Sequence, residues 1–304
     1  MIARAGRARS VRLPPDVAHS EITLRNIIMN RFQFWCGLAC GIAVTFAVSH
    51  SDTVQSAWAD DEKKADTEPA AEEIPMLYEL RTYYTPDGKL DALNARFRNH
   101  TCALFTKHGM TNIGYWMPLE NAERKLYYIL SYPGRASRET SWKAFMDDAD
   151  WKKAFAESEK EGKLVAKVES TFLQTTDFSP EVKLEKKDPA RVFELRTYTA
   201  STGNLPRLHE RFRKHTVALF AKHGMENFGY WSLDKGQAGA DDTLLYLLAH
   251  KSKEASEASF KAFRDDPAWV AARGASEKAA GGSLTVKDGV KSVMMAPTDY
   301  SPAR

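Results

Sequence analysis

Two histidines, His100 and His215, are the residues of this chain whose type and spacing best suit chemistry. Each lies in a repeated Phe-Arg-x-His-Thr pattern, at residues 97–101 and 212–216. At 100° per residue, His100 shares the apolar helical stripe of Leu93, so its imidazole is expected to point toward a sheet. Such a histidine could bind a ligand, shuttle a proton or donate to haem iron. The alternative is a neutral core histidine bonded to a tyrosine or to a backbone group.

An acid and a base two residues apart form a second repeated pair, Glu79 with Arg81 and Glu194 with Arg196. Residues two apart on a strand share one face. General acid–base work by Glu79 requires a raised pKa, and the neighbouring arginine opposes that shift. If this face is turned toward the other half of the molecule, the pairs are expected to form structural ion pairs between the two halves.

Two aromatic pairs, Tyr115-Trp116 and Tyr230-Trp231, each follow a glycine that lets backbone or ligand approach closely. They are candidates for a pocket that binds an apolar or aromatic ligand. Packing in an aromatic core is the alternative.

Other chemistries find no support in the sequence. It holds no phosphate-binding glycine loop, no zinc-protease motif, no paired cysteines and no nucleophile elbow. His100 and His108 lie eight residues apart on one helix, a rise of about 12 Å, too far for one metal ion. No metal site and no cofactor are predicted, with haem as the one alternative. Cys102 corresponds to Val217 in the second copy, which indicates a structural role.

The first 59 residues resemble an export signal. An apolar run covers residues 32–48, and Ala57 and Ala59 are the small residues that signal peptidase favours, so cleavage is expected after Ala59. Met29 is the expected true start. The protein is then periplasmic or extracellular, unless residues 32–48 stay as a membrane anchor.

Charge disfavours a nucleic-acid partner. Six arginines and three acids lie in residues 1–59, so the rest of the chain carries equal numbers of basic and acidic residues. Residues 60–75 are acidic and lack periodicity, which indicates a flexible leader.

Duplication dominates the remaining sequence. Residues 79–116 and 194–231 align without a gap, with 24 of 38 positions identical. The repeats are predicted at residues 76–180 and 192–302, joined by a charged linker at 181–191.

Each repeat alternates between strand and helix patterns. In the first copy, strands are expected at residues 78–84, 113–117, 126–132 and 169–175. One helix is expected over 90–108, ended by Gly109, and another from about 142 that restarts near 151. In the second copy Asp266-Pro267 marks that restart.

The resulting β-α-β-β-α-β order is that of a ferredoxin-like unit, an α+β fold with helices on one face of its sheet. The bare sheet faces must be covered, so the two copies are expected to close over each other as an intramolecular dimeric α/β barrel.

The ordered motifs Glu-Leu-Arg-Thr-Tyr, Phe-Arg-x-His-Thr, Lys-His-Gly-Met and Asn-x-Gly-Tyr-Trp resemble those of the NIPSNAP family, and both copies carry them. The resemblance implies dimeric α/β-barrel domains of poorly defined activity. Animal members are mitochondrial proteins linked to membrane trafficking. The bacterial-type export signal sets this chain apart from them.

Together these features predict an exported, non-catalytic binder of a small apolar or aromatic ligand or of a protein partner. The alternative, by analogy of fold, is an oxygenase-type enzyme or a haem protein that uses a helix-borne histidine. Beyond the intramolecular pseudo-dimer, a further homo-oligomer is possible.

Overall fold

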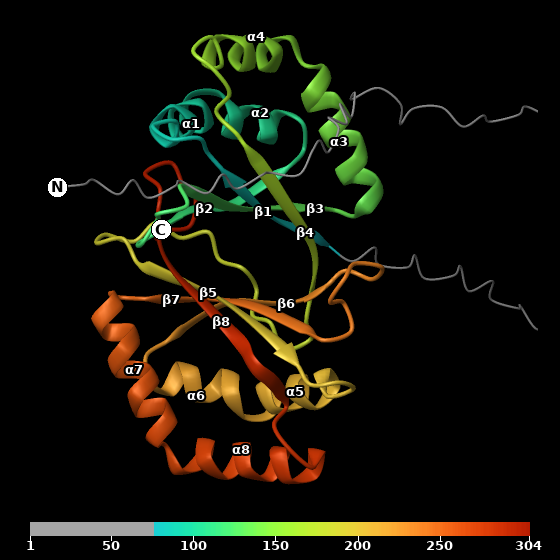
Figure 1. Cartoon of the computed structure of the whole chain (residues 1–304), viewed down its shortest axis with the longest axis vertical. Coiled ribbons are helices and arrows are strands. Elements are labelled where there is room, and N and C mark those ends of the chain that lie inside the picture. The colour runs from blue at the N-terminus through green and yellow to red at the C-terminus, as the bar shows by residue number, and fades with distance from the viewer. Residues whose placement is uncertain (1–75) are drawn as a thin grey trace, which may run out of the picture. The chain divides into compact units, whose positions relative to one another are not determined.

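The computed structural model describes residues 76–304 (Figure 1). The predicted export signal, the possible anchor and the predicted leader lie outside these residues. Among the described residues, no helix has the length and apolarity that crossing a membrane requires.

Each repeat has four strands and a set of covering helices. In repeat 1 (residues 76–180) the elements are β1 Leu77–Tyr84, α1 Leu90–Arg96, η1 Phe97–Thr101, α2 Cys102–Lys107, β2 Thr111–Pro118, β3 Lys125–Tyr132, α3 Arg135–Asp147, α4 Ala149–Ser158 and β4 Lys167–Thr175. In repeat 2 (residues 192–302) they are β5 Val192–Ala200, α5 Leu205–Arg211, η2 Phe212–Thr216, α6 Val217–Lys222, β6 Glu226–Leu233, β7 Thr243–His250, α7 Lys253–Asp265, α8 Pro267–Ala280 and β8 Thr285–Pro297. The predicted β-α-β-β-α-β order is confirmed, although α3 begins seven residues before the expected start.

The eight strands close into one antiparallel barrel in the order β1-β3-β2-β8-β5-β7-β6-β4. Strands form the middle of the molecule in Figure 1, and the helices of each repeat cover the outside of its own four strands. Two short seams of three residue pairs each join the repeats. Trp116–Pro118 pair with Met295–Pro297, and Leu173–Thr175 pair with Trp231–Leu233.

The barrel interior is an apolar core to which both repeats contribute. Leu80, Trp116 and Ile129 come from repeat 1, and Leu195 and Trp231 come from repeat 2. The predicted closure of bare sheet over bare sheet is thus confirmed. The burial of these side chains between the repeats is the main force that holds them together.

Each repeat ends by packing a short segment on the helices of the other. In the segment after β8, Arg98 binds Asp299 through two hydrogen bonds of 2.6 and 2.7 Å, and the Tyr300 hydroxyl donates to Asn94. In the segment after β4, Asp177 binds Arg213 with the same two distances. The repeats therefore exchange their C-terminal segments.

The first helix of each repeat is interrupted by a π turn. The backbone N–H of Cys102 donates to the Phe97 carbonyl five residues earlier, and Val217 does the same to Phe212. This turn holds one residue more than an α-helical turn, so the following positions rotate relative to the expected stripe. The Thr101 hydroxyl fills the widened turn by donating to the Arg96 carbonyl at 3.2 Å.

The π turn overturns the predicted orientation of the histidines. Thr101 and Thr216 take the inward positions and are buried, whereas His100 and His215 are exposed. The expectation that these imidazoles point at the sheet is therefore wrong, because it assumed an unbroken α-helix.

Candidate functional site

A buried carboxylate, Glu79, lies on the β1 face that is turned toward the helices of repeat 1. Arg138 of α3 donates Nε and Nη2 to its two oxygens at 3.1 Å each, and Arg81 pairs with it from the same strand. The hydroxyls of Tyr132 and Ser170 donate at 2.9 and 2.7 Å. Burial alone would raise the pKa of Glu79, but the hydrogen bonds from Arg138 and the charge of Arg81 lower it to about 2.

Glu194 is the counterpart in repeat 2, with a different set of partners. Arg196 pairs with it, and His250 Nε2 lies 3.1 Å from Oε2. The hydroxyls of Ser256 and Ser292 donate at 3.3 and 2.5 Å. Burial would raise the pKa of Glu194, but its bond with His250 and the charge of Arg196 lower it to about 2.

These two clusters correct the expected lock between the halves. Each ion pair lies between the sheet and the helices of its own repeat, because β1 and β5 turn their alternate residues, among them Leu80 and Leu195, into the barrel. In repeat 1 the ion pair with Arg138 thus fastens α3 to the sheet, whereas in repeat 2 both members of the ion pair lie on β5.

Beside the Glu79 cluster, a cavity of about 370 Å³ opens between the helices and the sheet of repeat 1. This volume suits a small organic molecule. We call it the repeat 1 pocket. Its walls are mainly aromatic and apolar: Tyr83, Phe97, Phe105, Trp142, Phe145, Met146, Trp151, Phe155, Val165 and Val168, with Arg81, Arg96, Thr101, Glu159 and Lys163 as the polar members.

A buried arginine, Arg96, and a partly buried one, Arg81, give the repeat 1 pocket its polar character. Arg81 lies 4.4 Å from the ring centre of Trp142, and Arg96 lies 5.4 Å from that of Trp151. Arg96 Nη1 is also 3.3 Å from a carboxylate oxygen of Glu159. Both cations are therefore held in place by rings and carboxylates before any ligand arrives.

The mouth of the repeat 1 pocket exposes apolar side chains to solvent. Met146, Phe155 and Val168 are 53%, 41% and 43% exposed. Helix register aligns α3 and α4 with α7 and α8, so the counterparts of Met146 and Phe155 are Arg264 and Arg273. Repeat 2 therefore has arginines where repeat 1 has an apolar entrance.

Titratable groups in and around this pocket are held far from neutral pKa values. The pKa of Glu79, about 2, makes its carboxylate a weak general base near pH 7. Burial raises the pKa of the Cys102 thiol to about 11, and burial also raises the pKa of Tyr128 well above its ordinary value. The surroundings therefore suit binding better than proton transfer.

The predicted aromatic residues lie in the core. Tyr115 and Tyr230 pack between helix and sheet, and Trp116 and Trp231 fill the barrel interior, all at 0% exposure. A Cβ on Gly114 would come within 2.3 Å of the Trp116 ring, so the preceding glycine makes room for the indole. A ligand could reach these four side chains only by displacing others.

Sequence reasoning missed the residues that line the repeat 1 pocket. The predicted ligand-binding residues include neither Trp142 nor Trp151 nor Arg96. Arg96 could have indicated this pocket, because it lies beside the apolar helical stripe and arginine is almost never buried without a partner.

A histidine–aspartate contact joins two helices in each repeat. His108 at the end of α2 lies 2.7 Å from Asp148, which caps the N-terminus of α4. His223 and Asp266 repeat the same distance. This arrangement explains the second pair of repeated histidines, His108 and His223, as structural. The helix restart predicted at Asp266-Pro267 is confirmed, with Asp266 as the N-cap of α8.

Comparison with known proteins assigns the fold to a family. The NIPSNAP profile matches residues 78–180 and 193–302, one segment for each repeat. The chain belongs to the NIPSNAP family. No curated protein sequence matches this chain.

Solved structures share the fold of this NIPSNAP protein at low identity. A provisionally assigned monooxygenase from Fusobacterium nucleatum is 10% identical with a TM-score of 0.50, and the match covers 74% of this chain and 93% of that one. A NIPSNAP family protein from Agrobacterium tumefaciens is 22% identical over 35% of this chain and 98% of that one, with a TM-score of 0.32. At such identities a structural match shows the fold alone, and the chemistry depends on this chain's own residues.

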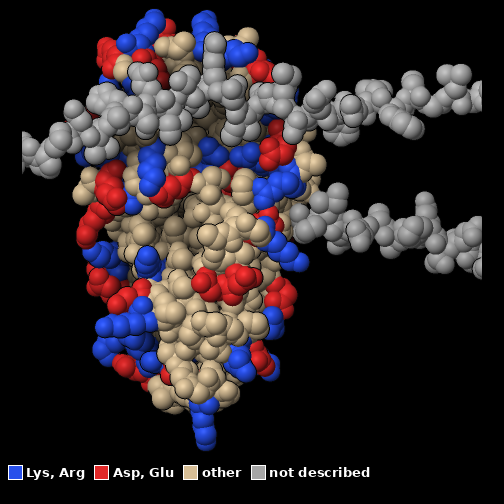
Figure 2. Space-filling view, turned by 45° about the vertical axis from the view of Figure 1, so that its right-hand side comes forward, with Lys and Arg blue, Asp and Glu red and all other residues tan. Residues whose placement is uncertain are grey.

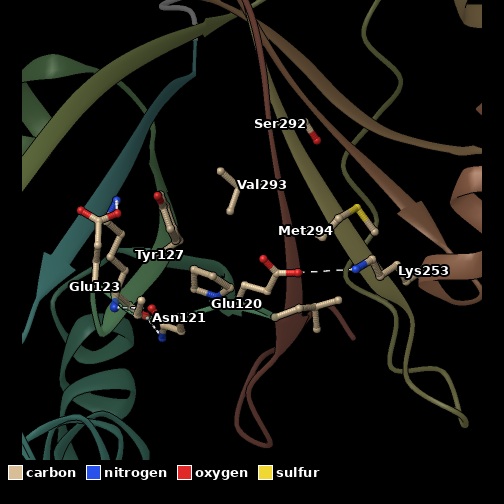
Figure 3. A pocket seen from close by; sticks show the side chains of 12 residues that line it. Glu120, Asn121, Glu123, Tyr127, Lys253, Ser292, Val293 and Met294 are labelled. Carbon is tan, nitrogen blue, oxygen red and sulfur yellow. Dashed lines mark hydrogen bonds and ion pairs between the residues drawn. The ribbon is translucent and has the colours of Figure 1, made fainter.

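A second cavity of about 370 Å³ lies at the seam where β2 and β8 separate (Figure 3). Lys253 points toward Glu120 across this cavity, with 3.6 Å between their charged atoms, and Lys125 pairs with Glu123. Its charges are thus satisfied within the protein, which makes it a weaker candidate than the repeat 1 pocket.

The surface in Figure 2 mixes acidic and basic side chains on both halves, with uncharged surface between them. Within residues 76–304, no group of three or more histidine, cysteine or acidic side chains is placed to hold a metal ion.

Proposed function

We propose that this NIPSNAP protein binds a small apolar or aromatic ligand in the repeat 1 pocket. The observation that carries the proposal is a cavity of about 370 Å³ walled by aromatic rings, with Arg81 and Arg96 at its polar side and apolar side chains around its mouth. Apolar surface left exposed around a cavity commonly marks a binding site.

The ligand that fits this pocket best carries an anionic group. Three cationic side chains, Arg81, Arg96 and Lys163, line the pocket. The carboxylates of Glu159 in the lining and of Glu79 beneath it number only two, so positive charge is in excess. An aromatic or apolar acid would place its rings among the tryptophans and its carboxylate toward Arg81. Guanidinium groups favour carboxylates because the two planar groups match.

Binding without turnover is favoured over catalysis, because Glu79, Cys102 and Tyr128 all have pKa values shifted away from neutrality. The haem alternative relied on His100 or His215 facing the sheet. Both imidazoles are exposed on the outer helix surface, where they could not reach iron held between helix and sheet.

A protein partner that covers the exposed mouth is the second candidate. It is favoured by the exposure of Met146, Phe155 and Val168 together. The two candidates differ in what they need. A small ligand needs the interior of the pocket, whereas a partner needs only its rim.

The test uses 1-anilinonaphthalene-8-sulfonate, an aromatic anion, as the probe. Val168→Trp should fill the pocket mouth and weaken probe binding at least tenfold, measured by probe fluorescence. Val290 is the matched control, since it occupies the same register position on β8 and is 42% exposed. Val290→Trp should leave the affinity within twofold.

Equal affinities for both variants would overturn the small-ligand proposal. Native mass spectrometry of protein purified from its own source adds an independent measurement. A retained compound of a few hundred daltons or less supports the small ligand. A stoichiometric second protein supports the partner instead.

We also propose that the protein acts outside the cytoplasm, from the apolar run at residues 32–48 and the Ala57 and Ala59 pair. N-terminal sequencing of the mature protein should read from Asp60. A mature chain that still contains residues 32–48 would indicate an anchor instead.

A further inference from the structure

Repeat 2 contains a buried arginine, Arg211, that its neighbours leave largely unsatisfied. The residue is 7% exposed. Its nearest polar contacts are long, with Nη1 at 3.5 Å from Ser276 and 3.9 Å from Glu277. Among the described residues, its Nε atom has no hydrogen-bond partner. Burial lowers the pKa of Arg211, as expected for a cation that lacks a close carboxylate.

The Nε atom of Arg96 is unpaired as well, so the difference between the repeats lies at Nη1, and a neighbouring arginine that repeat 1 lacks accounts for it. Arg273 binds Glu277 at 3.0 Å and draws that carboxylate away from Arg211. In repeat 1 the same helix position holds Phe155, and Glu159 remains 3.3 Å from Arg96. The same buried guanidinium is therefore paired in one repeat and underpaired in the other.

Arg211 lines a groove of about 240 Å³ between the first helix of repeat 2 and α8. We call it the α8 groove. Its lining is Arg207, Glu210, Arg211, Lys214, His215, Ala272, Ala275, Ser276 and Ala279. With histidine neutral, three cations and one carboxylate give this lining a net charge of +2. The alanine methyl groups form an uncharged wall opposite.

The matching region of repeat 1 has no such excess. Ala92 and Asn99 stand where Arg207 and Lys214 stand in repeat 2, and Glu157 stands where Ala275 stands. With histidine neutral, Arg96 is the only cation in that lining. Its charge is balanced by Glu157 in the lining and by Glu159, which lies 3.3 Å away. The positive charge of the α8 groove is thus a property of repeat 2 alone.

We propose that the α8 groove binds a phosphate group carried by a small molecule, with Arg211 as its buried anchor. A phosphate carries close to two negative charges at pH 7, which matches the +2 lining. Guanidinium nitrogens donate to phosphate oxygens in a planar fork, and Arg211 has donors free for this purpose. The groove is larger than one phosphate, so the alanine wall is left for a short apolar group.

This site is separate from the repeat 1 pocket and does not depend on ligand binding there. It differs also in chemistry, since the repeat 1 pocket is aromatic and the α8 groove is basic. His215, predicted to face the sheet, lies on the wall of this groove instead.

The test measures binding of inorganic phosphate and of glycerol 3-phosphate to the full chain by calorimetry at fixed ionic strength. Ala275→Glu restores the carboxylate that repeat 1 has at this position and should weaken binding of both at least tenfold. Ala271→Glu is the matched control, because Ala271 is exposed on the same helix outside the groove lining and adds the same charge. It should change the affinity less than twofold.

Equal losses for Ala275→Glu and Ala271→Glu would overturn the proposal, since they would indicate only long-range charge repulsion. Absence of phosphate and glycerol 3-phosphate binding in the wild-type chain would overturn it as well. Tighter binding of glycerol 3-phosphate than of phosphate would identify a small phosphomonoester as the occupant. Equal binding would identify the free anion. Arg211→Met should abolish binding, with thermal unfolding as the check that the chain remains folded.

Discussion

The two helix layers of this protein share one scaffold and differ in a few side chains. At the mouth of the helix–sheet layer, repeat 1 has Met146 and Phe155, and repeat 2 has Arg264 and Arg273. Repeat 1 thereby exposes an aromatic pocket, whereas Arg273 takes a carboxylate from Arg211 and leaves a basic groove. One helix position, Phe155 on α4 and Arg273 on α8, thus determines two features of each repeat. These are whether the pocket entrance is apolar and whether the buried arginine keeps its glutamate partner, so the two features are coupled.

The largest expected effect concerns the buried carboxylates. Glu79 holds two guanidinium groups, whereas Glu194 holds one guanidinium and an imidazole. Glu79→Gln should therefore cost about 5 kcal/mol of unfolding free energy and Glu194→Gln about 3 kcal/mol, because two partly buried guanidinium groups lose their buried carboxylate in repeat 1 and only one does in repeat 2. Denaturant unfolding at pH 7 measures both. Equal losses would mean that Arg138 adds nothing to the difference between the repeats.

In the wild-type protein, lowering the pH should reduce the stabilisation that Glu79 and Glu194 provide. Their folded pKa values of about 2 lie below the unfolded value, so the stabilisation is complete above about pH 5 and is lost as pH falls toward 2. The shift corresponds to roughly 3 kcal/mol for each carboxyl group. Unfolding free energies measured between pH 7 and 2.5 should fall along this curve. Each Glu→Gln variant should show a shallower decline than the wild type.

Exchanging the mouths tests the coupling directly. Phe155→Arg should weaken binding of N-phenyl-1-naphthylamine, the uncharged parent of the probe, about tenfold, equivalent to about 1.4 kcal/mol, because it places a charge in the apolar entrance without a sulfonate to attract. The reverse change, Arg273→Phe, should release Glu277 to pair with Arg211 and weaken phosphate binding in the α8 groove. If each variant altered the site of the other repeat instead, the assignment of the two sites would be wrong.

The smallest effects concern the π turns. Thr101→Val removes the hydroxyl that donates to the Arg96 carbonyl and should cost about 1 kcal/mol. His100→Ala, one residue earlier and exposed, should change stability by less than about 0.5 kcal/mol. Thermal unfolding of the two variants compares them. A larger loss from His100→Ala would restore the inward orientation that the sequence predicted.

The architecture could be predicted from the sequence because duplication and periodicity both act over many residues. Strand alternation, the Gly109 cap and the 24 identical positions all indicate the same repeated fold. Each depends on whole elements of the chain and not on single side chains. A bare sheet face also has few ways to be covered, which left closure of the two copies as the natural solution.

The site could not be predicted to the same extent, for two physical reasons. A π turn shifts the helix phase by one residue, and no sequence period reveals it, so the prediction that His100 points inward is wrong. The differences that distinguish the repeats, at Arg138, Met146 and Phe155, lie outside the stretch of high identity. Their meaning depends on which side chains α3 and α4 bring to the sheet.

Because the repeats exchange their C-terminal segments, their association does not require an intact linker at residues 181–191. Asp177 is anchored on the helices of repeat 2 and Asp299 on those of repeat 1, so each half is completed by the other. A protease that nicks the exposed linker near Leu184 should give two bands on a denaturing gel and one undivided species under native conditions. Severing the polypeptide would thus leave a heterodimer, and either half alone would have to find a second copy to close its sheet.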